Sequence, residues 1–313
     1  MGNLSAAFFT EAGSKRGMGH LVRSYTLYEK FRQEGAAVDF FLDSDLNYDH
    51  QFEDIRYFKF SELTIKQTYD VIFIDSYEAD LEIYEALSEV AKITVYIDDY
   101  ERLEYPAGVV INFAPDAKKL YFKKIKKGRE TLLGLKYLPI REEILKAKIK
   151  KENQIFIMLG GADIKGLSLK IIKSLDDVPL KKVIVINDQK LLKKMKDLKD
   201  TKILHKPSNE VLVQNMAKSS LAITTASMSL YELHYLKTKT VIVAINENQE
   251  NGEKQLIKHK LASMFIDLKS DQWEKEILQE ITASSENRDK ITSFIDGKGV
   301  ERIYSQVLQR LRG

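Results

Sequence analysis

Short apolar runs alternate with helical segments along this chain, and that alternation limits the possible folds more than any other feature. In the first half, the apolar runs predict strands at 4–9, 37–42, 71–74, 93–97 and 109–111. Segments 21–35 and 81–91 between them have the periodicity of helices. Because the strands are apolar throughout rather than alternating, they are typical of a parallel sheet that helices cover on both faces.

The same pattern restarts in the second half, after a basic and polar stretch at 141–153. The predicted strands there are 155–159, 183–186, 203–204, 221–224 and 240–244, and the predicted helices are 167–175, 191–198, 210–217 and 229–236. The sequence therefore predicts an α/β protein of two doubly wound, Rossmann-like domains, 1–145 and 146–313, facing each other across a cleft that holds the substrate. A last helical stretch at 290–312, broken near Gly297 and Gly299, is expected to pack on a domain surface, and its return to the first domain is left open.

Composition excludes several classes of protein. With no cysteine, the 313 residues have no disulfide framework and no thiolate metal site. No run approaches the roughly 20 apolar residues of a membrane span and the N-terminus lacks the layout of a secretion signal, so we expect a cytoplasmic protein. The net charge of +3, from 49 basic and 46 acidic residues, gives no reason to expect nucleic acid as a partner. We interpret the lysine-rich segments 118–129 and 181–202 as solvated faces, and a monomer is the favoured oligomeric state.

A glycine-lined turn after the first strand carries the clearest candidate catalytic residue. Its sequence is GMGHLVR, from Gly17 and Gly19 through His20 to Arg23. Glycines let backbone N–H groups approach a phosphate or a sugar, and the start of a helix adds unpaired donors and a positive field. That field disfavours imidazolium, which makes His20 a candidate general base. The alternative is a histidine that only caps or packs the first helix.

Polar residues follow the other predicted strands of the first domain, where they would share an edge with His20. Asp75 and Tyr77 follow strand 71–74, and Asp98 and Asp99 follow strand 93–97. Each aspartate is a candidate to orient His20 or to activate water, and each is equally well explained as a cap or turn residue. Asp43-Ser44-Asp45 is similar to the metal-binding motif of one glycosyltransferase class, but that class lacks two matching halves, so we expect neither a metal nor a cofactor.

Two clusters in the second domain suit a nucleotide. Gly160-Gly161-Ala162-Asp163 lies between a strand and a helix, where backbone amides can cradle a diphosphate; the alternative is a plain turn. Ser227 and Glu232 follow strand 221–224 and suit phosphate oxygens and ribose hydroxyls, although helix capping also explains the serine. Asn248 and Gln249 follow the next strand, where amides can read a uracil or a sugar or simply form a polar turn.

These motifs together resemble the inverting UDP-sugar hydrolases of pseudaminic acid biosynthesis, the PseG family, with the related spore-coat protein SpsG. The matching segments are GMGHLVR (17–23), IDSY (74–77), IDDY (97–100), LPIREE (138–143), MLGGADIKGLSLKI (158–171), TTASMSLYEL (224–233) and ENQE (247–250). The chain departs from the family where Phe9-Thr10-Glu11 replaces an opening of arginine, a variable residue and aspartate, and it is longer at its C-terminus.

The resemblance implies a trimmed GT-B glycosyltransferase fold of the MurG type. It implies a second domain that binds UDP through Gly161, Ala162, Asp163, Ser227 and Glu232, and a first domain that holds the sugar, with His20 catalytic and Tyr77 near the sugar. Water activated by His20 would attack the anomeric carbon of UDP-2,4-diacetamido-2,4,6-trideoxy-β-L-altropyranose, invert it and release UDP without a metal.

From the motifs and this resemblance together we assign the candidate site residues. His20 is assigned to catalysis. The residues assigned to substrate binding are Gly17, Gly19, Arg23, Asp75, Tyr77 and Asp99, and those assigned to the nucleotide are Gly160, Gly161, Ala162, Asp163, Ser227, Glu232, Asn248 and Gln249. Two other functions stay open: a GT-B glycosyltransferase with a UDP-sugar donor, and a noncatalytic nucleotide-sugar-binding protein.

Overall fold

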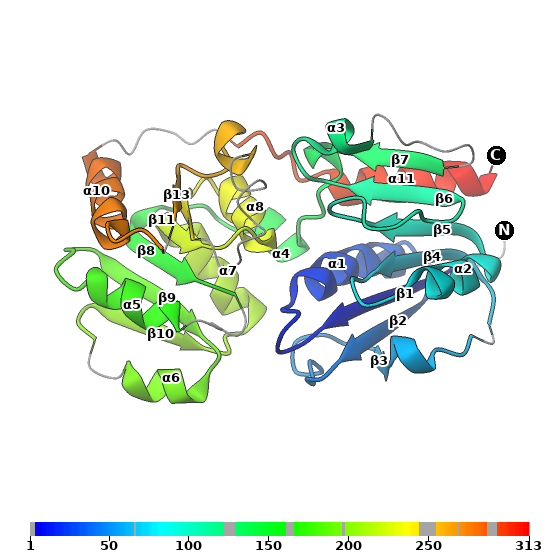
Figure 1. Ribbon diagram of the computed structural model, residues 1–313, viewed down its shortest axis with the longest axis horizontal. Coiled ribbons are helices and arrows are strands. Elements are labelled where there is room, and N and C mark those ends of the chain that lie inside the picture. The colour runs from blue at the N-terminus through cyan, green and yellow to red at the C-terminus, as the bar shows by residue number, and fades with distance from the viewer. Residues whose placement is uncertain are drawn as a thin grey trace. The chain divides into compact units, whose positions relative to one another are not determined.

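The chain divides into two compact units in the computed structural model (Figure 1). Unit 1 comprises Met1–Arg141 and Asp296–Gly313, and unit 2 comprises Glu142–Ile295. The structure describes residues 4–65, 67–121, 129–160, 166–195, 198–243, 255–267, 269–286 and 293–312. Within these ranges, no helix has the length and apolar character that crossing a membrane requires.

Unit 1 is built on a seven-stranded parallel sheet with the order β3-β2-β1-β4-β5-β6-β7. The strands are β1 (Ser5–Ala12), β2 (Ala37–Ser44), β3 (Ile55–Phe58), β4 (Tyr69–Asp75), β5 (Ala91–Ile97), β6 (Gly108–Asn112) and β7 (Arg129–Leu133). The helices are α1 (Gly19–Gln33), η1 (Phe60–Glu62), α2 (Leu81–Glu89), α3 (Ala117–Tyr121), η2 (Leu135–Tyr137) and α11 (Gly299–Arg312).

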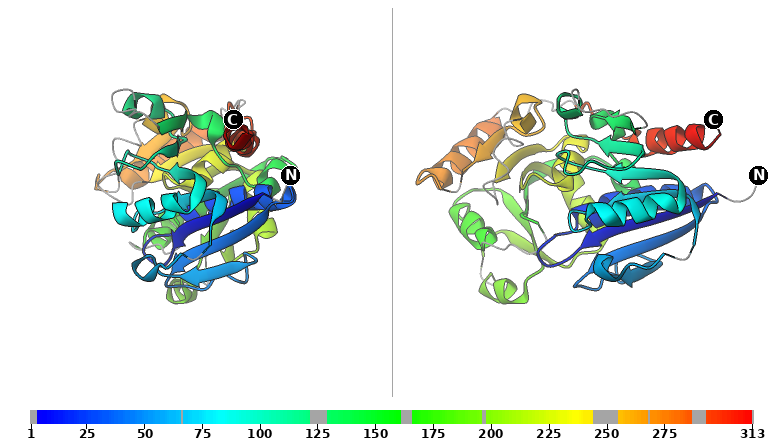
Figure 2. Two further views of the ribbon diagram at one scale, coloured as in Figure 1. Left: turned by 90° about the vertical axis from the view of Figure 1, so that its right-hand side faces the viewer. Right: turned by 45° about the vertical axis from the view of Figure 1, so that its right-hand side comes forward.

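Both faces of this sheet are buried, which explains why its strands are apolar throughout. Successive residues of β1 point to opposite faces. Phe8 stacks on Phe73 with ring centroids 4.5 Å apart and meets Phe31 of α1 on one face. Phe9 belongs to the cluster on the other face, together with Tyr84 of α2. The right-hand view of Figure 2 shows α2, in cyan, in front of this sheet.

The C-terminal helix α11 packs within unit 1, against α1 and β5 (red in Figures 1 and 2). Its buried residues include Val300, Ile303 and Val307, and the ring of Tyr304 meets Phe31 edge-on at 4.9 Å. The break that the sequence indicated lies at Gly297, which has φ +72°, whereas Gly299 is the first residue of the helix.

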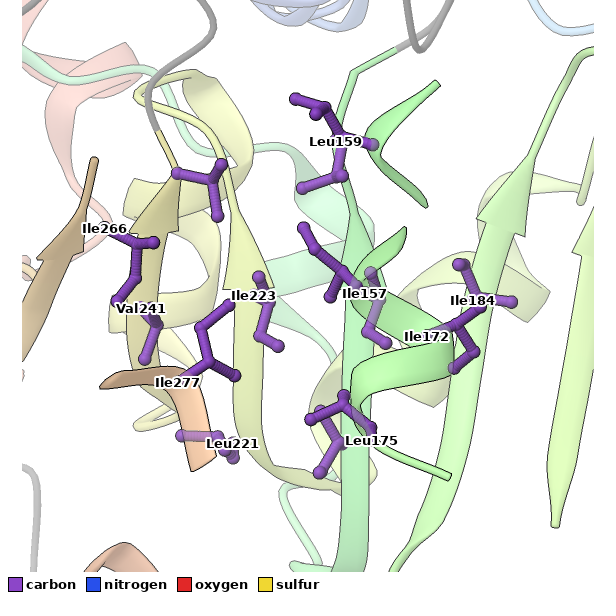
Figure 3. Packing of buried hydrophobic residues seen from close by; sticks show 14 of the residues in the cluster. Ile157, Leu159, Ile172, Leu175, Ile184, Leu221, Ile223, Val241, Ile266 and Ile277 are labelled. Atoms are coloured by element: carbon purple, nitrogen blue, oxygen red, sulfur yellow. The ribbon is translucent and has the colours of Figure 1, made fainter. Parts of the chain in front are cut away.

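Unit 2 repeats the architecture with a six-stranded parallel sheet of order β10-β9-β8-β11-β12-β13. The strands are β8 (Glu152–Met158), β9 (Lys181–Ile186), β10 (Thr201–His205), β11 (Ser219–Thr224), β12 (Lys239–Val243) and β13 (Met264–Ile266). The helices are α4 (Glu142–Leu145), α5 (Leu167–Ser174), α6 (Gln189–Lys194), α7 (Asn209–Lys218), α8 (Met228–Tyr235) and α10 (Trp273–Glu286). Figure 3 shows Ile157 and Ile223 of the central strands packed with Ile172 of α5 and Ile277 of α10.

The predicted fold class is confirmed, and the strands that the sequence missed are at sheet edges. Strands β3, β7 and β13 were not predicted. All three are edge strands, β3 is half exposed, and β13 has only three residues. Helix α10 was also missed. The helix predicted at 191–198 is shorter and ends at Lys194.

Replacing Gly299 with alanine should destabilise unit 1. A Cβ built there lies 2.0 Å from the backbone oxygen of Leu138, which cannot move aside as a side chain would. We expect Gly299→Ala to lower the free energy of unfolding by about 1–3 kcal/mol, as overpacking does. Ser305→Ala, on an exposed position of the same helix, is the matched control and should change it little. Equal stability of the two variants in urea unfolding would contradict the close approach.

Candidate active site

The candidate catalytic residues of unit 1 lie where the winding direction of its sheet reverses. Neighbouring strands β1 and β4 are at the centre of the order β3-β2-β1-β4-β5-β6-β7, with the chain progressing outward on both sides. Such a switch point is the usual ligand site of a doubly wound sheet, because the loops after the two strands diverge there. His20 follows β1 on the first turn of α1, and Asp75 is the last residue of β4.

His20 and Asp75 form a buried hydrogen-bonded pair. Nδ1 of His20 lies 2.6 Å from Oδ1 of Asp75, and the two residues are 8% and 1% exposed. Burial alone would raise the pKa of Asp75, but attraction to Arg23 and His20 and their hydrogen bonds hold that pKa well below its usual value. An ionised carboxylate only accepts hydrogen bonds, so the proton between them belongs to Nδ1. In the neutral form of His20 this arrangement leaves the lone pair on Nε2, where it can accept a proton.

Arg23 lies between two carboxylates and binds each through two nitrogens. Nε and Nη2 donate to Asp75 over 2.6 Å each, while Nη1 and Nη2 donate to Asp99 over 2.8 and 3.0 Å. Burial would lower the pKa of Arg23, but the two carboxylates raise it, and Arg23 in turn lowers the pKa of Asp99 against the effect of desolvation. Arg23 is therefore a cation and both aspartates are anions at neutral pH.

Two aromatic side chains stand beside this cluster. The ring of Tyr77 meets the His20 imidazole edge-on, with centroids 4.4 Å apart, and lies 5.3 Å from the ring of Tyr100. Its hydroxyl donates to Asp99; desolvation and the charge of Asp99 raise the pKa of Tyr77. Tyr77 and Tyr100 are 41% and 54% exposed, so they offer an accessible apolar surface next to the mostly buried imidazole.

Glu11 is a residue whose role the sequence did not reveal. It lies at the end of β1, is 1% exposed, and accepts hydrogen bonds from the backbone N–H groups of Tyr77 at 3.0 Å and Glu78 at 3.1 Å and from the hydroxyl of Ser76. Glu11 therefore fixes the loop that carries Tyr77. The sequence shows only a carboxylate two residues after the first predicted strand.

Several other sequence expectations for unit 1 need revision. The N–H of Gly17 donates to the carbonyl of Gly13 at 2.9 Å, so this glycine shapes the turn, with φ +72°, and its amide is not directed at a ligand; Gly19 is the first residue of α1. Asp98 does not orient His20, because it accepts from the hydroxyl of Tyr105 at 3.0 Å and from the N–H of Glu101 at 2.7 Å.

Asp43 and Asp45 are engaged with neighbouring side chains. Asp43 accepts from Lys59 at 2.9 Å and from the N–H of Phe60 at 2.9 Å. Asp45 accepts from both the N–H and the hydroxyl of Ser14. These contacts give both carboxylates a structural role in the loops after β1 and β2.

Unit 2 has its own switch point, between β8 and β11, and the described nucleotide candidates lie there. Gly160 follows β8 with φ +88°, and Ser227 precedes α8 at its N-cap position. The side chain of Ser227 makes no capping hydrogen bond, so capping does not explain this serine, and Glu232 is 2% exposed on α8. Gly161, Ala162, Asp163, Asn248 and Gln249 lie outside the described residues.

The chain is similar in sequence to two bacterial proteins with related names. It is 23% identical over 273 residues to UDP-2,4-diacetamido-2,4,6-trideoxy-β-L-altropyranose hydrolase of Campylobacter jejuni, covering 82% of this chain and 97% of that protein. It is 25% identical over 239 residues to the pseudaminic acid cytidylyltransferase and UDP-2,4-diacetamido-2,4,6-trideoxy-β-L-altropyranose hydrolase of Helicobacter pylori, covering 74% of this chain and 43% of that longer protein. No family model matches the chain.

Solved structures match over almost the whole length of both chains. MurG of Acinetobacter baumannii superposes with a TM-score of 0.59 at 12% identity, covering 98% of this chain and 99% of that one. The UDP-GlcNAc 2-epimerase of Methanocaldococcus jannaschii, solved with UDP-GlcNAc and UDP, superposes with a TM-score of 0.65 at 10% identity, covering 98% and 100%. The chain has the GT-B fold. The resemblance that the sequence motifs indicated is confirmed by the two bacterial hydrolases and by this fold.

The lowered pKa of Asp75 makes the stability of unit 1 depend on pH. Its ionised form stabilises the fold above about pH 3.9, the unfolded value, and this contribution is lost as pH falls toward the lower folded pKa. We expect the difference in free energy of unfolding between wild type and Asp75→Asn to be smaller at pH 3 than at pH 5. Hydrogen exchange of unit 1 peptides across a urea series measures it, with exposed Glu62→Gln as control. A difference that is unchanged at pH 3 would contradict the charged pairing.

Proposed function

We propose that this protein is a nucleotide-sugar hydrolase that cleaves UDP from a UDP-2,4-diacetamido-2,4,6-trideoxyhexose with inversion at C1, as in pseudaminic acid-type biosynthesis. The observation that carries the proposal is the His20–Asp75 pair at the switch point of a GT-B fold. The names of the C. jejuni and H. pylori relatives support the choice of substrate.

His20 is the general base in this proposal. Nε2 takes a proton from a water molecule as the water oxygen attacks the anomeric carbon. The bond between that carbon and the diphosphate oxygen breaks, and its electron pair leaves with UDP. Asp75 keeps the other proton on Nδ1 and stabilises the imidazolium that forms, which is the role of the carboxylate in other histidine–carboxylate pairs. No step is assigned to a metal ion or an organic cofactor.

The sugar is assigned to unit 1 and UDP to unit 2. Tyr77 and Tyr100 are placed against the apolar face of the sugar, which is supported by their exposure beside His20. In unit 2 the turn after β8 and the hydroxyl of Ser227 are assigned to the diphosphate. The positive end of α8 would stabilise the negative charge on the departing UDP. Glu232 is assigned to the ribose, and Gly161, Ala162, Asp163, Asn248 and Gln249 to the rest of the nucleotide.

Arg23, Asp75 and Asp99 have a different role in this proposal from the substrate binding inferred from the sequence. Arg23 is 5% exposed and directs four N–H groups at the two carboxylates. A guanidinium with its hydrogen bonds used in this way has little capacity for a ligand. We therefore assign these three residues to the environment of His20.

A glycosyltransferase on the same scaffold is the second candidate, and the match to MurG favours it. That reaction needs an acceptor hydroxyl in place of water, and the same His20–Asp75 pair would activate it. A transferase releases UDP slowly until an acceptor is added, whereas a hydrolase releases it at full rate in buffer alone.

Replacing His20 should strongly reduce turnover and preserve nucleotide binding. We expect His20→Ala to lower kcat by roughly 100-fold or more, because it removes the general base. Its affinity for UDP, measured by calorimetry, should match the wild type. Proton NMR of UDP and free sugar follows the reaction, and His50→Ala, at an exposed histidine of unit 1, serves as the matched control with normal rates.

Near-normal turnover in His20→Ala would remove this residue from the catalytic role. UDP binding without release of sugar by the wild-type protein would reject the hydrolase and favour a transferase or a noncatalytic binding protein.

A further inference from the structure

Asp99 is a second anion near His20, and the hydrogen bond between His20 and Asp75 gives it no role. It binds Arg23 through both carboxylate oxygens and accepts the hydroxyl of Tyr77, and no direct bond joins it to His20 in the described structure. With neutral His20, the cluster holds one guanidinium and two carboxylates, which gives it a net charge of −1. Protonation of His20 brings that net charge to zero.

We propose that Asp99, acting through Arg23, is a positioning residue that raises the proton affinity of His20 and holds it in the tautomer of a general base. This inference rests on the proposed function only in calling His20 a general base. The arrangement of charges around His20 can be tested without substrate.

Three charged groups and one helix end act on the imidazole. Asp75 contacts Nδ1 at 2.6 Å, and Nη2 of Arg23 approaches the same nitrogen at 2.9 Å. The Tyr77 ring adjoins the imidazole and brings no charge, and the N-terminal end of α1 disfavours imidazolium. Without Asp99, Arg23 and Asp75 would cancel, and protonated His20 would be an uncompensated charge at a mostly buried position. Asp99 therefore favours transfer of a proton to His20.

Asp99 also decides where the hydrogens of Arg23 point. Nη2 carries two hydrogens, and its acceptors are Oδ1 of Asp75 at 2.6 Å and Oδ2 of Asp99 at 3.0 Å. Loss of the Asp99 acceptor frees one hydrogen to donate to Nδ1 of His20. That donor would compete with the carboxylate of Asp75 at Nδ1 and weaken the preference for a proton there. The other tautomer, with its proton on Nε2, has no lone pair there for water.

The test is the NMR titration of the His20 imidazole in the free protein, assigned with His20→Ala. We expect Asp99→Asn to move the titration midpoint to lower pH by about one unit, a modest effect for loss of a nearby charge. Arg23→Gln should move it to higher pH, because two carboxylates then face the imidazole with no guanidinium. Arg23→Lys, which restores the charge, should return it toward the wild-type midpoint.

Glu78→Gln is the charge-matched control, since Glu78 is an exposed carboxylate in the loop of Tyr77. Its midpoint should equal that of the wild type. The ¹⁵N shifts of the neutral imidazole report the tautomer, with the proton on Nδ1 in the wild type and a larger fraction on Nε2 in Asp99→Asn. Circular dichroism checks the folding of each variant; the Asp99 side chain is 32% exposed, so its substitution disturbs the core least.

Opposite shifts in Asp99→Asn and Arg23→Gln support the proposal, even if the protein fails to hydrolyse a UDP-sugar. A folded Asp99→Asn variant with an unmoved midpoint and an unchanged tautomer overturns it, even if His20-dependent hydrolysis is observed. The hydrolase assignment and this inference therefore fail on different measurements.

Discussion

The buried carboxylate of Asp75 is the interaction on which the candidate site depends. It accepts hydrogen bonds from His20, from two nitrogens of Arg23 and from the hydroxyl of Ser24 at 3.1 Å, so both of its oxygens are fully used. Burying a carboxylate costs several kcal/mol, and here the cost is offset by an ion pair with Arg23 and these hydrogen bonds. The three partners lie on one helix, α1, so the carboxylate also fixes that helix against β4.

The parallel sheet explains why this charge cluster forms at all. The connections that follow the neighbouring strands β1 and β4 lie on opposite faces of the sheet. The start of α1 therefore lies beside the end of β4. Glu11 follows Thr10, the residue of β1 that pairs with Asp75. Its carboxylate holds the loop that places Tyr77 against His20. Unit 2 repeats this strand order, and its switch point lies between Gly160 and Ser227. The two units thus use the same topology around different residues: a histidine and carboxylates in one, small residues and a helix start in the other.

The sequence predicted the fold class because nearly every central strand is a continuous apolar run, as in Val71–Ile74 and Ile155–Leu159. It could not identify β3 or β13, because edge strands bury little and need no such run. For His20 the sequence offered three possible aspartate partners. Only the strand order and the bend after β5 show that Asp75, and not Asp98, contacts the imidazole. The spacing of three between His20 and Arg23 places both on one helix face, which was a usable signal for their contact. Glu11 gave no such signal, since its partners are backbone N–H groups 66 and 67 residues away.

In the proposed reaction water attacks the anomeric carbon, and UDP leaves with its own oxygens. The direct measurement is mass spectrometry of the products formed in ¹⁸O-water from UDP-2,4-diacetamido-2,4,6-trideoxy-β-L-altropyranose, sampled before the free sugar exchanges its anomeric oxygen. The expected result is one ¹⁸O atom in the free sugar and none in UDP. Label in the terminal phosphate of UDP would place the attack at phosphorus and contradict the role given to His20.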